Sequence, residues 1–214
     1  MNIKVIILYL LLASPTSAAT KLLMHDAAGA VSGYKKMDTA LGPGLTTSVT
    51  NTVAGPTSGV QITKTAGGTL LAWISAPLAS AGTISGTVTL NTWASESAAP
   101  ANSGMQVTVH KYSGGSEGAA FLNTEKGTEL TTSIANQNWT GTPTSTSFAI
   151  GDRIVVKWWI NDAGGNMGTG KTVTADYDGT GAGADGETYV QFTENLSFQS
   201  EDATPAGRRV VVMD

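Results

Sequence analysis

The amino-acid sequence predicts an all-β protein, a jelly-roll-like sandwich of two antiparallel sheets with extended terminal arms. An up-and-down barrel is the main alternative. Three observations predict this fold. Apolar and polar residues alternate along several short runs, Gly-Gly and Asp-Gly pairs separate these runs, and charged residues make up only 13% of the 214 residues. Alternation places successive side chains on opposite faces of a sheet. Glycine-centred pairs favour tight turns, and a shortage of Glu, Lys and Arg disfavours long surface helices.

The first 19 residues have the layout of a secretory signal peptide. Lys4 supplies a basic start, residues 5–12 are apolar, and residues 13–19 are small residues that include Pro15. We expect cleavage near Ala19. The apolar run is shorter than the roughly 20 residues that a membrane-spanning helix needs. The sequence therefore predicts a secreted or cell-surface protein that has no membrane contact after cleavage.

The mature chain divides into three parts. Residues 20–58 are expected to form an N-terminal strand, TKLLMHD, followed by a Gly/Thr-rich arm with a weak strand near residues 45–53. Residues 59–198 form the sandwich domain. Residues 199–214 comprise a polar linker and a terminal strand with three consecutive valines, which have high β propensity.

Strands are expected throughout the sandwich domain, in runs of alternating character. They lie near residues 60–62, 71–73, 83–93, 105–110, 148–160, 172–177, 190–192 and 196–198. Trp158 and Trp159 are neighbours on one of these runs, so one indole should face the core and the other the outer face. If a short helical turn occurs, we expect it between Glu117 and Ile134.

Composition excludes several functions. The formal net charge of −4 leaves no basic patch to neutralise phosphates, so nucleic acid is not an expected partner. The absence of cysteine excludes disulfides, thiolate metal sites and cysteine nucleophiles. The two histidines, His25 and His110, lie in no catalytic motif. The carboxylates available for acid–base work have no recognisable context either, and we expect no enzyme; they are Glu96, Glu117, Glu125, Glu129 and Glu194.

Residues 165–172, GNMGTGKT, match the pattern of a phosphate-binding loop. That loop requires a helix to open at the lysine, because the helix N-terminus and the loop amides hold the phosphates. Here Lys171 is followed by the alternating run 172–177, which predicts a strand. We therefore interpret the glycines as a hairpin loop and reject a nucleotide site.

The next loop carries four acidic residues among glycines: Asp176, Asp178, Asp185 and Glu187. Oxygen ligands on a flexible loop suit Ca²⁺, and Asp176 and Asp178 would point to the same side if the strand continued through them. The alternative is a solvated turn in which Asp stabilises the backbone. No other cofactor is expected.

Tryptophan is frequent, with five in the chain. An exposed indole can stack on a sugar ring or anchor a protein interface, although core packing is the alternative for each one. Trp139 and Trp159 are the candidates for sugar stacking.

Residues 151–165, GDRIVVKWWINDAGG, and residues 177–198, YDGTGAGADGETYVQFTENLSF, resemble the closing half of uncharacterised jelly-roll-like proteins from environmental bacteria and their phages. The KLLMHD start and the Thr-rich run 46–53 are similar to the N-terminal part of the same group. The resemblance implies a jelly-roll fold and supplies no catalytic residues. Phage particle proteins do not carry signal peptides, so the signal peptide of this chain favours an exported protein.

These features predict a structural subunit of an extracellular filament or surface assembly that polymerises with itself by strand exchange. Exposed sheet edges accept a strand from a neighbouring chain. The expected assembly residues lie in the two terminal strands: Leu22, Leu23, Arg208, Arg209, Val210, Val211 and Val212. Pairing of both strands within their own chain is equally compatible with the sequence. A secreted carbohydrate-binding module and a phage particle protein are the alternative functions.

Overall fold

The computed structural model describes residues 19–41, 47–52, 60–61, 71–163, 168, 170–178 and 187–201. Strands contain 59% of these residues, and their helical structure is limited to a three-residue 3₁₀ turn, η1 (Ala99–Ala101). The all-β prediction is therefore confirmed. The helical turn expected between residues 117 and 134 is wrong, because most of the first half of that segment is a strand paired with its predecessor.

The strands of the first half are β1 (Thr20–Ala28), β2 (Lys35–Asp38), β3 (Thr47–Thr52), β4 (Val60–Gln61), β5 (Ala72–Ser75), β6 (Gly82–Ile84) and β7 (Val88–Glu96). Those of the second half are β8 (Ser103–Ser113), β9 (Ser116–Glu125), β10 (Ala135–Gly141), β11 (Thr146–Phe148), β12 (Arg153–Asp162), β13 (Thr172–Tyr177) and β14 (Tyr189–Phe192). Strand β10 was not expected from the sequence, because ANQNWTG contains few apolar residues.

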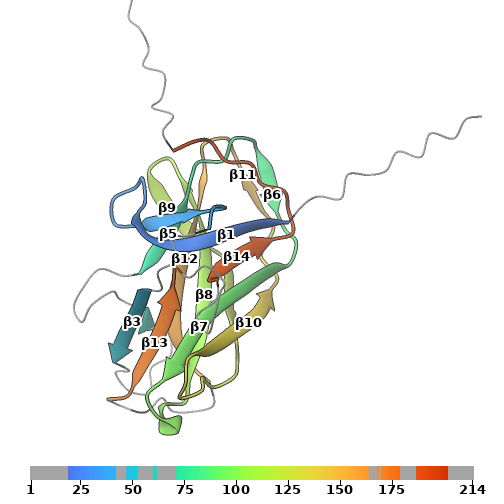
Figure 1. Ribbon diagram of the computed structural model, residues 1–214. Helices are drawn as coiled ribbons and strands as arrows, with labels where there is room; N and C mark the ends of the chain where they lie inside the picture. Colours follow the sequence, from blue (N-terminus) through green and yellow to red (C-terminus); the bar gives the residue numbers. More distant parts are fainter. Residues whose placement is uncertain are drawn as a thin grey trace, which may run out of the picture.

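The large sheet has the order β3-β13-β7-β14-β1-β2-β5-β12-β8-β9, with β10 added to β7 and β4 added to β12. Strands β1 and β2 join the half around β7 to the half around β12, and β1 crosses the molecule transversely to β8 and β12 (Figure 1). A small second sheet contains β11 and β6. The pairing of β2 with β5 is parallel, unlike the expected antiparallel arrangement. The long connection through residues 39–71 permits this crossover.

The alternating runs bury one face, as predicted. Met105, Val107 and Val109 of β8 are fully buried, whereas the intervening residues are more exposed. Trp158 is fully buried and Trp159 is partly exposed on the opposite face, so that prediction is confirmed. The indole of Trp158 lies 4.6 Å from that of Trp73 and 6.2 Å from the ring of Tyr177. These rings form the centre of the core.

The run 83–93 is two strands, not one. Glu194 accepts hydrogen bonds from the backbone N–H groups of Ser85 (2.8 Å) and Gly86 (2.7 Å), which turns the chain between β6 and β7. A Cβ atom on Gly86 would lie 1.9 Å from Thr193 Oγ1, so glycine is required at this close approach. Burial opposes ionisation of Glu194, but these backbone donors outweigh it and lower its pKa.

The expected N-terminal arm contributes strands to the large sheet. β1 pairs with β14 on one side and with β2 on the other, and β3 pairs with β13. Leu22 and Leu23 of β1 are 0% and 5% exposed and lie in the core of their own chain. Of the two pairings compatible with the sequence, the structure shows the intrachain one for β1. Residues 208–212 lie outside the described residues.

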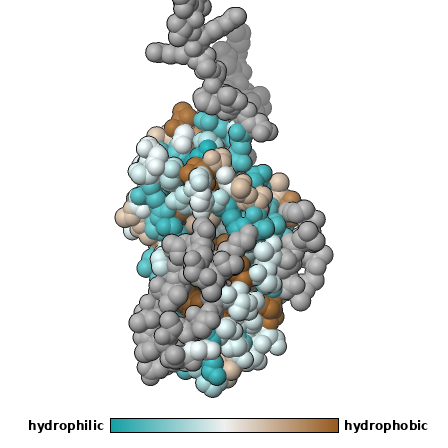
Figure 2. All heavy atoms as spheres, turned by 90° about the vertical axis from the view of Figure 1, so that its left-hand side faces the viewer, coloured by the Kyte–Doolittle hydropathy of each residue, from teal (hydrophilic) through white to brown (hydrophobic). Residues whose placement is uncertain are grey.

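On the face shown in Figure 2, most described residues are hydrophilic or close to neutral, and hydrophobic residues form small patches. Among the described residues, the exposed large hydrophobic side chains are Leu41 and Ile150. This surface reflects the Thr, Ser and Gly content of the sequence.

Candidate functional site

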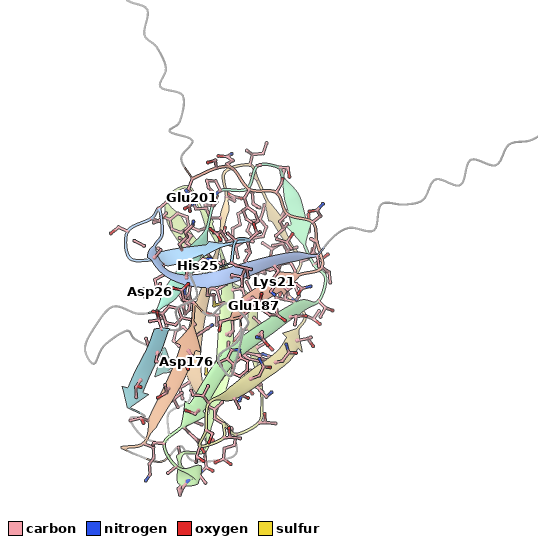
Figure 3. The ribbon with its side chains drawn as sticks, in the orientation of Figure 1. Lys21, His25, Asp26, Asp176, Glu187 and Glu201 are labelled. Carbon is pink, nitrogen blue, oxygen red and sulfur yellow. The ribbon has the colours of Figure 1, made fainter. Side chains whose placement is uncertain are left out.

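Charged side chains gather along β1 and the segments beside it (Figure 3). Lys21 forms an ion pair with Glu187, and its ammonium lies 4.3 Å from the centre of the Tyr189 ring. Partial burial lowers the pKa of Lys21. Asp26 forms an ion pair with Lys35 and accepts a 2.7 Å hydrogen bond from the Tyr177 hydroxyl. These contacts fasten β1 to β2, to β13 and to the start of β14.

His25 is held between two carboxylates. Its Nδ1 lies 3.1 Å from Asp178 Oδ1, and its Nε2 lies 3.0 Å from Asp38 Oδ1. The residue is only 7% exposed. A carboxylate accepts hydrogen bonds and does not donate them, so both contacts are hydrogen bonds only when both ring nitrogens carry a proton. Neither nitrogen is then free to act on a substrate.

Asp38 is itself held by neighbours on β2 and just beyond it. Lys36 Nζ lies 2.6 Å from Asp38 Oδ2, and the Ala40 N–H donates to Asp38 Oδ1 at 2.8 Å. Burial opposes ionisation of Asp38, but these donors outweigh it and lower its pKa. A cleft of about 240 Å³ opens beside this cluster, lined by His25, Ala27, Lys36, Asp38, Ala40, Leu41 and Asp178.

The expected calcium ligands have separate partners in the structure. β13 ends at Tyr177, and Asp178 has a left-handed backbone with φ +66°, so Asp176 and Asp178 do not continue one strand. Asp178 contacts His25, Glu187 contacts Lys21, and Asp176 is buried at the end of β13. Asp185 lies outside the described residues. Within the part of the chain that the structure describes, no three His, Asp or Glu side chains converge to hold a metal ion.

The phosphate-loop match also lies partly outside the described residues. Its final residue, Thr172, begins β13. The strand expected after Lys171 is therefore present, and no helix opens there.

Trp159 lies on the polar outer face of β12, and its orientation is set by a chain of hydrogen bonds. Its Nε1–H donates to Thr108 Oγ1 at 2.9 Å, and Thr108 Oγ1 lies 2.9 Å from His110 Nε2. The hydrogen-bond partner of His110 Nδ1 is the Gly118 carbonyl at 3.1 Å, and Glu117 Oε1 lies 3.1 Å from the same nitrogen as an ion-pair contact. The register places Trp159 opposite Gln106 on the neighbouring strand β8. The indole is thus held in place beside polar side chains.

Glu117 lies beside the end of this chain of hydrogen bonds. It accepts from Lys157 Nζ at 2.6 Å and from the Tyr34 hydroxyl at 2.9 Å. Burial, followed by the hydrogen bond to Glu117, raises the pKa of Tyr34 to about 12. The phenol therefore stays protonated and bonded at neutral pH, and it ties the β1–β2 turn to the outer face of β9.

Trp139 does not provide an exposed sugar platform. It lies on β10, partly buried, and packs against the hydrophobic core. Its indole nitrogen is buried. Sequence reasoning did not find the strand that carries Trp139, because β10 lacks a clear alternating pattern.

A groove of about 430 Å³ separates two strand edges at the end of the molecule where β8 turns into β9. One wall is the start of β9, with the small residues Gly118, Ala119 and Ala120, and the other is the segment that leads into β11. The full lining is Lys111, Ser113, Ser116, Gly118, Ala119, Ala120, Phe121, Thr144 and Thr146. Within the described residues, β9 pairs with β8 and β11 pairs with β6. The two walls are joined where the Thr144 N–H donates to the Phe121 carbonyl at 2.8 Å. Sequence reasoning missed this groove because it depends on how two distant strands lie in space.

The glutamates that lie in no recognisable catalytic motif of the sequence have different surroundings in the structure. Glu117 and Glu194 make the contacts described above. Glu96 and Glu129 meet at the opposite end of the molecule from the groove. Glu125, at the end of β9, is exposed.

Comparisons with known proteins show the fold alone. No family model and no curated protein matches the chain. Among solved structures, it is similar to an aminopeptidase from a marine sediment Thaumarchaeota archaeon, with 10% identity over 82% of this chain and a TM-score of 0.56. It is also similar to a CocE/NonD family hydrolase from Staphylococcus aureus, with 8% identity over 83% of this chain and a TM-score of 0.51.

A third similar structure is an α-amino acid ester hydrolase, with 12% identity over 85% of this chain and a TM-score of 0.52. The chain spans only 36%, 37% and 38% of these three proteins.

Among the residues that the structure describes, no helix has the length and apolar character needed to cross a bilayer.

Proposed function

We propose that the mature protein is an exported, non-catalytic structural subunit that assembles with copies of itself by strand insertion. Residues 208–212 of one copy enter the groove between β9 and β11 of the next copy. The observation that carries this proposal is the groove itself, because the β9 residues Gly118 to Ala120 that line it pair with no strand other than β8 within the described residues. A strand placed there satisfies backbone groups on the edge of β9.

The chemistry of the groove suits an inserted strand. Gly118, Ala119 and Ala120 leave room for a second backbone. Phe121 lines the groove, and its largely buried ring packs edge-on against Phe148 at 5.7 Å. In an extended RRVVV segment, Val210 and Val212 share one face, and burial of one valine contributes about 1.5 kcal/mol or more.

The position of the chain end suits the same proposal. Glu201 lies 3.9 Å from Arg153, which begins β12 and pairs with Tyr112 near the end of β8. Glu201, the last described residue, therefore lies at the end of the sandwich where the groove opens. A donor from one copy and a groove on another make a head-to-tail contact, which propagates as a fibre.

The ion pairs that surround β1 support a structural function. His25 has both ring nitrogens directed at carboxylates, and Asp26, Lys21 and Glu187 are paired across neighbouring strands. Such pairing holds β1 in the sheet. Because β1 is an interior strand, we assign the donor function to residues 208–212 alone.

Substitution of Ala120 by Arg is expected to prevent assembly, because the long side chain fills the groove. Sedimentation velocity of residues 20–214 should show larger species as the wild-type concentration rises, whereas Ala120→Arg stays monomeric. Thr132→Arg, at an exposed position of the β9–β10 connection, is the matched control and should assemble. A wild type that stays monomeric at every concentration would contradict the proposal, as would normal assembly of Ala120→Arg.

Glycan binding on the outer face of β12 is the second candidate function. The observation that favours it is the indole of Trp159, held by Thr108 beside two hydrogen-bonded amides, Gln106 and Asn123, which lie 2.6 Å apart. Sugar rings stack on such an indole while amides bind their hydroxyl groups.

Trp159→Ala is expected to weaken binding of a neutral polysaccharide about fivefold, through loss of stacking worth about 1 kcal/mol. Affinity electrophoresis measures this loss, and Trp139→Phe, at a ring packed on the core, is the control. Unchanged affinity in Trp159→Ala, or no binding to a glycan array by the wild type, would remove this candidate.

A further inference from the structure

Glu96 and Glu129 bring two carboxyl groups together where one of them is buried. Glu96 ends β7 and is 2% exposed, whereas Glu129 is an exposed residue of the β9–β10 connection. The Oε2 atom of Glu96 accepts a 3.0 Å hydrogen bond from the Ser103 N–H. Its Oε1 atom is buried and has no donor. The Leu130 N–H donates to the Ser103 carbonyl at 2.8 Å, which places Glu129 next to the residue that binds the Glu96 carboxylate.

Two ionised carboxylates in contact repel each other, and a buried oxygen without a donor is costly. One proton shared between the two carboxyl groups removes the repulsion and gives the buried oxygen a hydrogen-bond partner. We propose that Glu96 and Glu129 bind a single proton as a carboxyl–carboxylate pair, and that loss of this proton weakens the end of the sandwich where β7, β8 and residues 126–134 meet.

The surroundings of Glu96 support this assignment. β8 contributes the Ser103 N–H, and the β9–β10 connection contributes the Glu129 carboxyl and the Thr131 carbonyl, which accepts the Glu96 N–H at 2.9 Å. Glu129 is the charged group that acts on Glu96 among the described residues. Burial first, and then Glu129, raises the pKa of Glu96 from 4.5 to about 7.

The direction of the pH dependence follows from this shift. The folded protein binds the proton on Glu96 more tightly than the unfolded chain does, so the bound proton stabilises the fold. This contribution to the free energy of unfolding is complete below pH 4.5 and is lost as the pH rises through about 7. Gln at position 96 reproduces the protonated group, because its carbonyl can accept from Ser103 while its NH₂ donates to Glu129.

Thermal unfolding between about pH 5 and pH 8.5 tests the proposal. The Tm of the wild type should fall by about 5 °C more than that of Glu96→Gln over this range. Glu125→Gln, at an exposed carboxylate on β9, is the control and should follow the wild type.

A carboxyl-detected NMR titration gives the second readout. The Glu96 signal should titrate near pH 7 in the wild type and at a lower pH in Glu129→Gln, still above 4.5 because burial, the larger cause of the raised pKa, remains. A wild-type midpoint near 4.5, or Tm curves of wild type and Glu96→Gln that run parallel across the range, would overturn the proposal. Neither result bears on assembly through the groove, which lies at the other end of the molecule.

Discussion

Substitution of Trp158 by Ala is expected to lower the free energy of unfolding by about 3–5 kcal/mol, the usual cost of removing a large buried aromatic ring. Trp158 is 0% exposed and packs against Trp73 and Tyr177 at the centre of the core. Its removal opens a cavity between the two halves of the large sheet. Guanidinium unfolding followed by circular dichroism measures the change.

The neighbouring residue provides the control. Trp159 occupies the same strand but the opposite, partly exposed face, so Trp159→Ala should cost about 1 kcal/mol, mainly through its lost hydrogen bond to Thr108. Trp158→Phe should cost less than Trp158→Ala, because it keeps part of the ring and removes a buried N–H without an acceptor. Equal losses in Trp158→Ala and Trp159→Ala would contradict the assignment of the two faces.

Deletion of residues 206–214 is expected to abolish assembly and leave a folded monomer. The three valines of the segment contribute several kcal/mol to the contact, so their loss should raise the concentration needed for assembly by about 100-fold or more. Electron microscopy and sedimentation of the truncated protein measure this. Restoring the segment with Val210→Lys and Val212→Lys should leave the protein monomeric, because lysines cannot pack on Phe121.

Deletion of residues 206–214 should have little effect on the Tm of the protein, because the donor residues 208–212 pack on another copy. A large loss of Tm without any loss of assembly would show that the segment folds onto its own chain.

The alternation of apolar and polar residues was sufficient by itself to predict most of the strands. Met105, Val107 and Val109, the Trp158–Trp159 pair and Val173, Ala175 and Tyr177 all bury the face that the pattern indicates. Strands with weak alternation could not be found this way. Strand β10 is polar and holds its place through seven residue pairs with β7, which is tertiary context that a local pattern does not contain.

The contacts of the candidate site depend on distant pairing and were beyond sequence reasoning. His25 and Asp178 are 153 residues apart, and they meet because β1 lies beside β14 and the end of β13. The acidic loop was recognised from its composition, but the left-handed backbone at Asp178 redirects its side chain to His25. The contact between Glu96 and Glu129 likewise requires the β9–β10 connection to return to the end of β7.

Intermolecular cross-linking tests strand insertion most directly, because the chain contains no cysteine and introduced thiols have no competitors. One protein carries Ala119→Cys in the groove, and a second carries Cys at Val210, Val211 or Val212. Mixed under mild oxidation, the groove variant and at least one donor variant should form a disulfide-linked heterodimer that grows with concentration. No heterodimer with any of the three donors, together with rapid intramolecular bonding when both thiols lie in one chain, would contradict insertion between copies.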